Sequence, residues 1–269
     1  MEKVTRLAKK SDRELVLNFC KNTFSWGDYI HEVWDSWINE GTLIVIDNQN
    51  VPISMAHAAT YDNEKMIWIE GIRVNENFRK HGIAQKMIAH FEADARKQGL
   101  KLSRMLIASE NVPSLTLAQK LGYQKISKWN YFSLESKEFT QEFDVSMENC
   151  LSDDQLIDEK KFHFIESWRW LPMTRNRLDT LNSENKILCK KSNNQTVSMG
   201  IITESESFEN TIILEILFGT ELEEIIKFTQ NLAYGKNYSK VRILTELDSL
   251  PKIKNLENKF PFYLMEKNI

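Results

Sequence analysis

The order of predicted elements occurs twice along the chain, and this repetition constrains the fold more than any other feature. A β-hairpin, a third strand and an amphipathic helix are predicted in the first half, from hydrophobic alternation followed by apolar residues at helical spacing. The same order returns in the second half. The segments are 42–61, 65–74 and 83–98, and then 186–204, 211–219 and 221–238. We interpret this repetition as an internal duplication.

Strands that alternate with helices predict a mixed α/β sheet covered by helices on both faces. A chain of 269 residues favours two modest domains over one. The polar, acidic segment 137–160 has no strand-like run, so we predict domains at 1–140 and 141–269. The second is then a degenerate version of the first. Just after the boundary, the aromatic-rich stretch 159–171 predicts a helix that ends before Pro172.

Composition excludes several classes of protein. A net charge of −3 and a pI near 6.0 argue against a nucleic-acid partner. The chain has no run of roughly 20 apolar residues, which a membrane span requires, and no secretory signal at its start. Its three cysteines are far apart and odd in number, so we expect them reduced in the cytoplasm. No HExxH or similar motif predicts a metal site.

The loop before the first long helix carries Arg79, Lys80, His81 and Gly82. A helix N-terminus presents main-chain N–H groups without internal partners and a partial positive charge, so cations there are unexpected unless an anion binds. Phosphate oxygens suit such a site, and glycine allows a close approach to the main chain. Ala84 keeps the first turn narrow. The alternative is a surface turn with solvated cations.

These residues resemble a signature of the GNAT superfamily of acyl-CoA-dependent N-acyltransferases. Its pattern Q/R-x-x-G-x-G/A after a strand is matched from Arg79 to Ala84. A second signature, N-x-x-A-x-x-L-Y-x-x-x-G-F/Y, is matched in part by Asn111, Ser114, Leu117, Gly122 and Tyr123. The resemblance extends over residues 1 to 136 in the order of elements. The rival dinucleotide fold needs three closely spaced glycines, which are absent.

The resemblance implies that acetyl-CoA is the co-substrate and that no metal takes part. Its pyrophosphate would bind the loop amides, and its pantetheine arm would lie between two splayed strands, beside a bulge at Gly71. The implied cofactor-binding residues are Ile72, Val74, Arg79, Lys80, His81, Gly82, Ile83, Ala84 and Asn111. In the second half, the equivalent loop is shortened to FGTE, so we expect no cofactor there.

The resemblance also points to Glu70 as the catalytic base, since family members often carry a carboxylate just before the bulge. Its apolar neighbours in sequence favour a raised pKa suited to proton abstraction. The alternative is a strand carboxylate that faces solvent or pairs with Arg73. The usual family tyrosine is replaced by Ala118, so Tyr131 or water would protonate the leaving thiolate, or catalysis has been lost. His57 is a spare candidate, although such a histidine is more often structural.

An acceptor site is expected where FSWGDYIHEVWDSW lies between the first two helices. Trp26, Asp28 and Tyr29 offer aromatic faces with a carboxylate beside them, which suits a cationic amine. The alternative is that Asp28 caps the next helix. We expect Trp34 and Trp37 to pack in the core.

The sequence therefore predicts an acetyl-CoA-dependent N-acetyltransferase. It would move an acetyl group to a primary amine of a small molecule or peptide, by direct transfer in a ternary complex. Two alternatives stay open. The chain is otherwise a non-catalytic acyl-CoA-binding or regulatory module, or an acetyltransferase that acts on protein N-termini or lysines.

Overall fold

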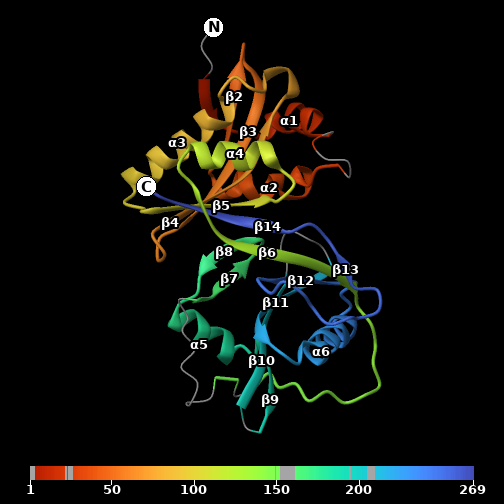
Figure 1. The fold of residues 1–269 in the computed structure, drawn as a ribbon. Helices are drawn as coiled ribbons and strands as arrows, with labels where there is room; N and C mark the ends of the chain where they lie inside the picture. Colours follow the sequence, from red (N-terminus) through yellow and green to blue (C-terminus); the bar gives the residue numbers. More distant parts are fainter. Residues whose placement is uncertain are drawn as a thin grey trace. The chain divides into compact units, whose positions relative to one another are not determined.

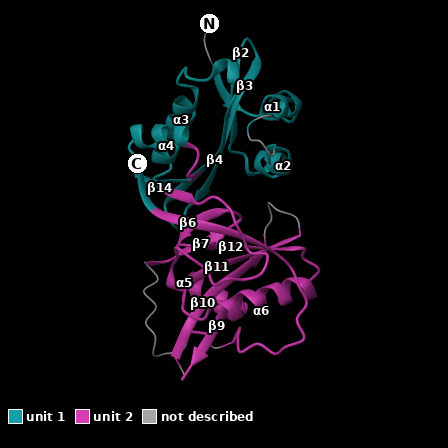
Figure 2. Ribbon diagram, turned by 45° about the vertical axis from the view of Figure 1, so that its right-hand side comes forward, with its two compact units in different colours: residues 1–106, 112–126, 265–269 teal, residues 107–111, 127–264 magenta. Residues whose placement is uncertain are grey.

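The computed structural model describes residues 4–21, 23, 27–148, 150–151, 161–193, 195–204 and 210–269. The described residues form two compact units that alternate along the chain (Figure 2). Unit 1 contains residues up to Leu106, Val112–Ile126 and Met265–Ile269, and unit 2 contains Ile107–Asn111 and Ser127–Leu264. The domain boundaries 1–140 and 141–269 stay a prediction, and each unit is described by its own residues.

Among its described residues, unit 1 contains four helices and the strands that come first along the chain (Figure 1). Its helices are α1 (Arg13–Cys20), α2 (Ile30–Glu40), α3 (Ile83–Lys97) and α4 (Val112–Lys120), with 3-10 turns at Lys10–Asp12 and Glu76–Phe78. Its strands are β1 (Val4–Leu7), β2 (Leu43–Asn48), β3 (Val51–Tyr61), β4 (Met66–Val74) and β5 (Leu102–Ala108), whose last two residues belong to unit 2.

The strands of unit 1 pair in the order β1-β2-β3-β4-β5, followed by the end of β14. The pairs from β1 to β4 are antiparallel, and β4 runs parallel to β5. Helices α1 and α2 cover one face of this sheet, and α3 and α4 cover the other (Figure 2). The mixed α/β architecture predicted from the sequence is therefore confirmed.

Unit 2 repeats part of this plan. Its elements are β6 (Gln124–Glu135, from Ser127 on), β7 (His163–Glu166), β8 (Arg169–Pro172), α5 (Arg175–Ser183), β9 (Ile187–Ser192), β10 (Gln195–Glu204), β11 (Thr211–Gly219), α6 (Leu222–Gly235), β12 (Lys240–Thr245), β13 (Glu257–Asn258) and the first part of β14 (Phe262–Asn268). The strand order is β6-β12-β11-β10-β9, with β11 and β12 parallel. Helix α6 contributes buried side chains to the core of this sheet.

The helix predicted over 159–171 is wrong for its described part, which forms a hairpin of β7 and β8. Its two-residue turn places Ser167 and Trp168 in the left-handed region, at φ 45° and 68°. Such turns match the natural twist of paired strands. Each strand buries two consecutive residues instead of alternating, and Ile165 and Trp170 are fully buried. The sequence therefore lacked the alternation that would have identified two strands.

The core of unit 1 forms where α2 packs against the sheet. Trp34 and Trp37 are buried there with Val45 and Met55, as expected. The β2–β3 hairpin turns through Gln49 and Asn50, both in the left-handed region. These contacts fix the position of α2, which carries side chains toward β3 and β4.

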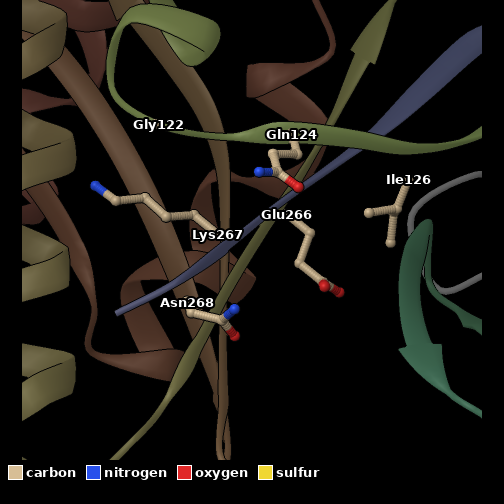
Figure 3. Close-up of a pocket in the computed structure, with 6 residues that line it drawn as sticks. All are labelled: Gly122, Gln124, Ile126, Glu266, Lys267 and Asn268. Carbon is tan, nitrogen blue, oxygen red and sulfur yellow. The ribbon is translucent and has the colours of Figure 1, made fainter.

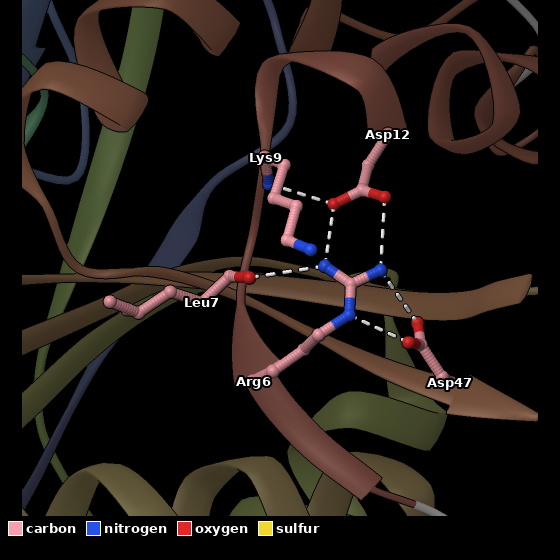
Figure 4. A network of polar contacts seen from close by, with 5 residues as sticks. All are labelled: Arg6, Leu7, Lys9, Asp12 and Asp47. Atoms are coloured by element: carbon pink, nitrogen blue, oxygen red, sulfur yellow. Dashed lines mark hydrogen bonds and ion pairs between the residues drawn. The ribbon is translucent and has the colours of Figure 1, made fainter. Parts of the chain in front are cut away.

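A charged network joins the first strand to the first helix (Figure 4). Arg6 donates two hydrogen bonds to Asp12 and two to Asp47, at 2.6 to 3.1 Å. Asp12 also accepts from the main-chain N–H of Lys9 at 2.7 Å. Because both carboxylates are nearly buried, this pairing satisfies charges that would otherwise be costly.

The end of the chain is held in unit 1 by a buried carboxylate. Lys267 donates to both oxygens of Glu92, at 2.9 and 2.7 Å, and Tyr123 donates to the same group at 3.0 Å. Burial raises the pKa of Tyr123, so its hydroxyl keeps the proton that it donates. Residues distant in sequence thus complete one side of unit 1.

Cys150 and Cys189 form a disulfide with Cα atoms 5.5 Å apart. The expectation that all three cysteines are reduced is therefore wrong. The sequence gave no sign of this pair because the two residues meet through an isolated bridge between Ser146 and Cys189. Cys20 is free and buried. Across the described residues, no helix is long and apolar enough to cross a membrane.

Candidate functional site

The predicted anion loop connects β4 to α3. Asn75 begins a 3-10 turn, and its side chain accepts from the N–H of Asn77. The chain then adopts left-handed backbone twice, at Lys80 with φ 64° and at Gly82 with φ 73°. Lysine tolerates this region poorly, at a cost of about 1 to 2 kcal/mol. The loop therefore stores strain directly before the helix.

The N-terminus of α3 has open main-chain donors. The first main-chain bond of the helix runs from Lys86 N to Gly82 O at 2.9 Å. Within the described part of the chain, no acceptor meets the N–H groups of Gly82, Ile83, Ala84 or Gln85. A Cβ atom at Gly82 would have no neighbour within 4 Å. Donors and open space thus coincide, which is the geometry that an anion needs.

The cations of the loop lie around these donors. Arg79, Lys80 and His81 are exposed. Arg79 Nε donates to Val74 O at 3.1 Å, and His81 Nδ1 lies 3.3 Å from Phe78 O. The first turn of α3 has no acidic residue. The site is therefore positive at both the main chain and the rim.

Strand β4 has a bulge at Gly71, as expected. The register with β3 shifts between the pairs His57–Glu70 and Met55–Arg73. Gly71 has φ 62°, and a Cβ there would lie 2.4 Å from Trp37 Cζ3. Only glycine satisfies both the backbone and the packing at this position.

Strands β4 and β5 separate beyond their first residues. Their ladder pairs Met66, Ile67 and Trp68 with β5 and is not continued through the rest of β4 in the described structure. The carbonyl of Ile72 accepts from Arg73 Nη1 and that of Val74 from Arg79 Nε, both at 3.1 Å. The second half of β4 is thus an edge that could receive an extended ligand.

Glu70 lies at the point where this separation begins. Its Oε1 is 3.0 Å from His57 Nδ1, and its Oε2 accepts from Trp68 Nε1 at 3.1 Å. Its side chain is 15% exposed. Arg73, which the sequence offered as a partner of Glu70, pairs with Asp28. Glu70 is thus oriented from both sides and still reaches solvent.

His57 is a residue that sequence reasoning undervalued. It is fully buried and stacks on Trp37, with centroids 4.5 Å apart and an interplanar angle of 5°. Its Nε2 lies 3.0 Å from Glu40 Oε2. The hairpin register contained the signal. Pairing of Tyr61 with Met66 across the β3–β4 turn places His57 opposite Glu70.

The predicted acceptor residues are only partly described. Trp26 lies outside the described residues. Asp28 is held by Arg73 through bonds of 2.6 and 3.1 Å, and it also accepts from Ile30 N at 3.2 Å. The Arg73 guanidinium lies 5.3 Å from the centre of the Tyr29 ring. Burial raises the pKa of Tyr29, which therefore stays neutral. Asp28 and Tyr29 do come together, with Arg73 between them.

The remaining predicted residues lie elsewhere. Asn111 directly precedes α4, and its N–H donates to Ala108 O at 2.9 Å. Tyr131 belongs to unit 2, where its ring meets those of Trp168 and Phe262. Ala118 is buried in α4. Their roles stay predictions.

A surface hollow of about 270 Å³ lies between β6 and β14 of unit 1 (Figure 3). It is lined by Gly122, Gln124, Ile126, Glu266, Lys267 and Asn268. None of the predicted site residues belongs to this set, and Lys267 and Glu266 are engaged with Glu92 and Arg104. The described residues contain no group of three or more side chains arranged to hold a metal ion.

Comparison with known proteins agrees with this geometry. Residues 13–123, which include the loop and both flanking elements, match the sequence model of the Acetyltransferase (GNAT) family. This part of the chain therefore resembles a GNAT acetyltransferase domain in sequence. The fold resembles a protein from Thermoplasma acidophilum over 99% of this chain and 100% of that one, with a TM-score of 0.64 and 13% identity.

Two further structures extend this likeness to the whole chain. A GCN5-related N-acetyltransferase from Sphaerobacter thermophilus gives a TM-score of 0.62 at 12% identity, covering 99% of this chain and 95% of that one. A tandem GNAT protein from the clavulanic acid biosynthesis pathway gives 0.56 at 9%, covering 99% and 98%. The predicted GNAT fold with a second GNAT-like unit is therefore confirmed. No curated protein matched the sequence.

Proposed function

We propose that this protein transfers an acetyl group from acetyl-CoA to a primary amine, by direct transfer in a ternary complex. The observation that carries the proposal is the open N-terminus of α3. The N–H groups of Gly82 to Gln85 have no partner among the described residues, and the first turn carries no acid. The match of residues 13–123 to the Acetyltransferase (GNAT) family model supports the reaction class.

The loop holds the diphosphate of the cofactor. The amides of His81, Gly82, Ile83 and Ala84 donate to its oxygens, while Arg79 and Lys80 add charge at the rim. The left-handed Lys80 supports this assignment, because strained backbone tends to occur at functional sites. Ile72 and Val74 offer main-chain groups to the pantetheine arm, and we assign Asn111 to cofactor binding from its match to the second signature.

Glu70 accepts the proton that the reaction releases. Transfer from a thioester to a protonated amine yields an amide, a thiol and one proton, so a base is required. Glu70 is oriented by His57 and Trp68 and reaches solvent. Ala118 has no proton to donate, and we assign protonation of the thiolate to Tyr131 or to water.

The acceptor is an amine of a small molecule or peptide, held near Trp26, Asp28 and Tyr29. Arg73 pairs with Asp28, and its guanidinium also lies 5.3 Å from the centre of the Tyr29 ring, so the charge and the aromatic face at this site already have a cationic partner. These residues therefore contribute orientation more than charge.

Calorimetric titration with acetyl-CoA tests the assignment. Gly82→Asp places a carboxylate among the donors, and we expect affinity to fall by at least about 100-fold, or about 2.7 kcal/mol. Gly99→Asp is the matched control, because Gly99 has φ 76° and open space at the other end of α3. Unchanged affinity in Gly82→Asp would exclude the site, whereas equal losses in both variants would indicate strain alone.

A second assay separates catalysis from binding. Thiol release is followed with wild-type protein, acetyl-CoA and a panel of small amines and peptides. Turnover with any member supports an enzyme. Tight cofactor binding without turnover on every member would instead favour the non-catalytic acyl-CoA-binding module.

A further inference from the structure

A buried histidine joins two carboxylates of unit 1. His57 has no exposed surface, and its two ring nitrogens face Glu70 and Glu40, each at 3.0 Å. Glu70 ends beside the proposed reaction site, and Glu40 is the last residue of α2, with a side chain that is 38% exposed. The three groups thus connect the proposed base to the protein surface.

The proton count of this cluster is constrained by its geometry. A neutral imidazole carries one N–H, so it can donate to only one carboxylate. Two nitrogen–oxygen contacts at 3.0 Å each need a proton between the two atoms. Both contacts are satisfied together when the cluster holds two protons, either as an imidazolium between two carboxylates or as a neutral ring beside one carboxylic acid.

The surroundings of His57 keep this arrangement in place. Trp37 of α2 stacks on the ring, and Glu40 of the same helix meets its Nε2. From β4 it faces Glu70, and from the segment before β2 it faces the hydroxyl of Thr42, 3.3 Å from Nε2. Trp37 thus covers the face of the ring, and both of its nitrogens have partners.

We propose that Glu40, at the surface, sets the proton affinity of the buried pair of His57 and Glu70, and so sets the pH above which Glu70 acts as a base. This inference rests on the proposed function for the role of Glu70. His57 and Glu40 are positioning residues that act through Glu70. The proton that Glu70 takes from the amine is bound more tightly while Glu40 is ionised.

The sign of the effect follows from Coulomb's law. Removing a negative charge weakens proton binding at every group coupled to it. Glu40→Gln keeps an acceptor for His57 Nε2 but removes the charge, so the cluster loses protons at lower pH. Because Glu40 is partly exposed, we expect a shift of about 0.5 to 1 pH unit.

Histidine-labelled protein gives a test that needs no turnover. The imidazole signal of His57, assigned through its contact with Trp37, is followed against pH. In Glu40→Gln its titration midpoint moves to lower pH. Glu32→Gln is the matched control on the same helix, because Glu32 lies 3.7 Å from His31. That variant moves the His31 signal and leaves His57 unchanged. Identical His57 titrations in wild type and Glu40→Gln would overturn the proposal.

The pH profile of kcat/KM tests the link to catalysis. The acid limb moves to lower pH in Glu40→Gln, stays in place in Glu32→Gln, and stays near wild type in Glu40→Asp, which keeps the charge. A shifted His57 signal with an unshifted acid limb would overturn the role of the cluster in catalysis. Absence of turnover with every amine, despite acetyl-CoA binding, would defeat the proposed function, while the His57 titration would still decide the coupling.

Discussion

The two strand–helix connections of the duplicated pattern differ in how they compensate the partial positive charge at the helix N-terminus. In unit 1, residues 75–82 separate β4 from α3, and the helix begins with free amides and no acid in its first turn. In unit 2, only Thr220 and Glu221 separate β11 from α6, whose first turn contains Glu223 and Glu224. Helix α6 therefore supplies its own anions, and α3 leaves its dipole for a ligand.

The strands before these helices differ in a related way. The β11–β12 ladder is continuous over six pairs, from Thr211 to Ile216, whereas the β4–β5 ladder has three. Strand β11 also shifts in register against β10, between the pairs Gly200–Ile216 and Met199–Phe218, so both strands carry a bulge and only the ladder on the other side differs. A continuous ladder offers no edge to an extended ligand. We therefore expect cofactor binding to require an open ladder and an open helix end together.

Each strand also carries a glutamate at the same position of the repeat. Glu70 pairs with His57 and Trp68. Glu215 lies opposite Ile201, accepts only from Ile165 N at 3.1 Å, and its Oε1 has no partner among the described residues. Burial raises the pKa of Glu215 well above the usual carboxyl range. Glu70 thus has partners at both oxygens and reaches solvent, whereas Glu215 is buried with one oxygen unpaired.

The largest expected effect separates these two glutamates. Glu70→Gln removes the proposed base and lowers kcat by about 10²- to 10⁴-fold, with acetyl-CoA affinity close to wild type. Glu215→Gln, the same change at the equivalent position, leaves kcat near wild type. Steady-state thiol release measures both. Full activity in Glu70→Gln would remove Glu70 as the base.

The bulge is tested by Gly71→Ala. The new Cβ meets Trp37 and occupies left-handed backbone, so we expect a loss of about 3 kcal/mol in the free energy of unfolding. Gly99→Ala has the same backbone penalty without the contact and costs about 1 kcal/mol. Urea unfolding gives both values. Equal losses would show that Trp37 adjusts to the extra atom.

A smaller effect depends on pH. Burial raises the pKa of Glu215, so the folded protein keeps the Glu215 proton at pH values where the unfolded chain has lost it. The free energy of unfolding of the wild type therefore falls as the pH rises above the ordinary carboxyl range. Glu215→Gln lacks this loss, and its advantage grows by up to about 1.4 kcal/mol per pH unit. Unfolding at about pH 5 and about pH 8 measures the trend, with Glu223→Gln as an exposed control. A constant difference would contradict a buried acid.

The smallest expected effect comes from placing an acidic residue in the first turn of α3, which has none. Gln85→Glu stabilises the free protein by about 0.5 kcal/mol through the helix dipole, and the same charge repels a diphosphate. We therefore expect a slightly higher melting temperature together with weaker acetyl-CoA binding. Glu223→Gln in α6 changes stability in the opposite sense and leaves binding alone. Stronger binding in Gln85→Glu would contradict an anion site.

Local pattern was enough to predict many elements. Helix α3 follows from apolar residues at helical spacing and ends at Lys97, two residues before Gly99, where the structure turns left-handed. The β2–β3 hairpin follows in the same way from its turn residues, whereas the Gly71 bulge was expected from the family resemblance. Each of these depends on neighbours within a few residues.

Contacts between residues far apart in the sequence could not be predicted from local pattern. The pairing of Arg73 with Asp28 spans 45 positions, and that of Lys267 with Glu92 spans 175. The disulfide of Cys150 and Cys189 depends on an irregular segment meeting an edge strand. Such contacts leave no periodic pattern in the sequence. The His57–Glu70 pair is intermediate, because the hairpin register predicts it once the turn is placed.

The division of the chain between units has a consequence for biosynthesis. Met265–Ile269 belongs to unit 1, although every residue of unit 2 precedes it in translation. During synthesis, the sheet of unit 1 therefore lacks its last strand until unit 2 has been made, and its open edge can pair with other strands. Folding of the proposed catalytic unit is complete only after the other unit has been synthesised.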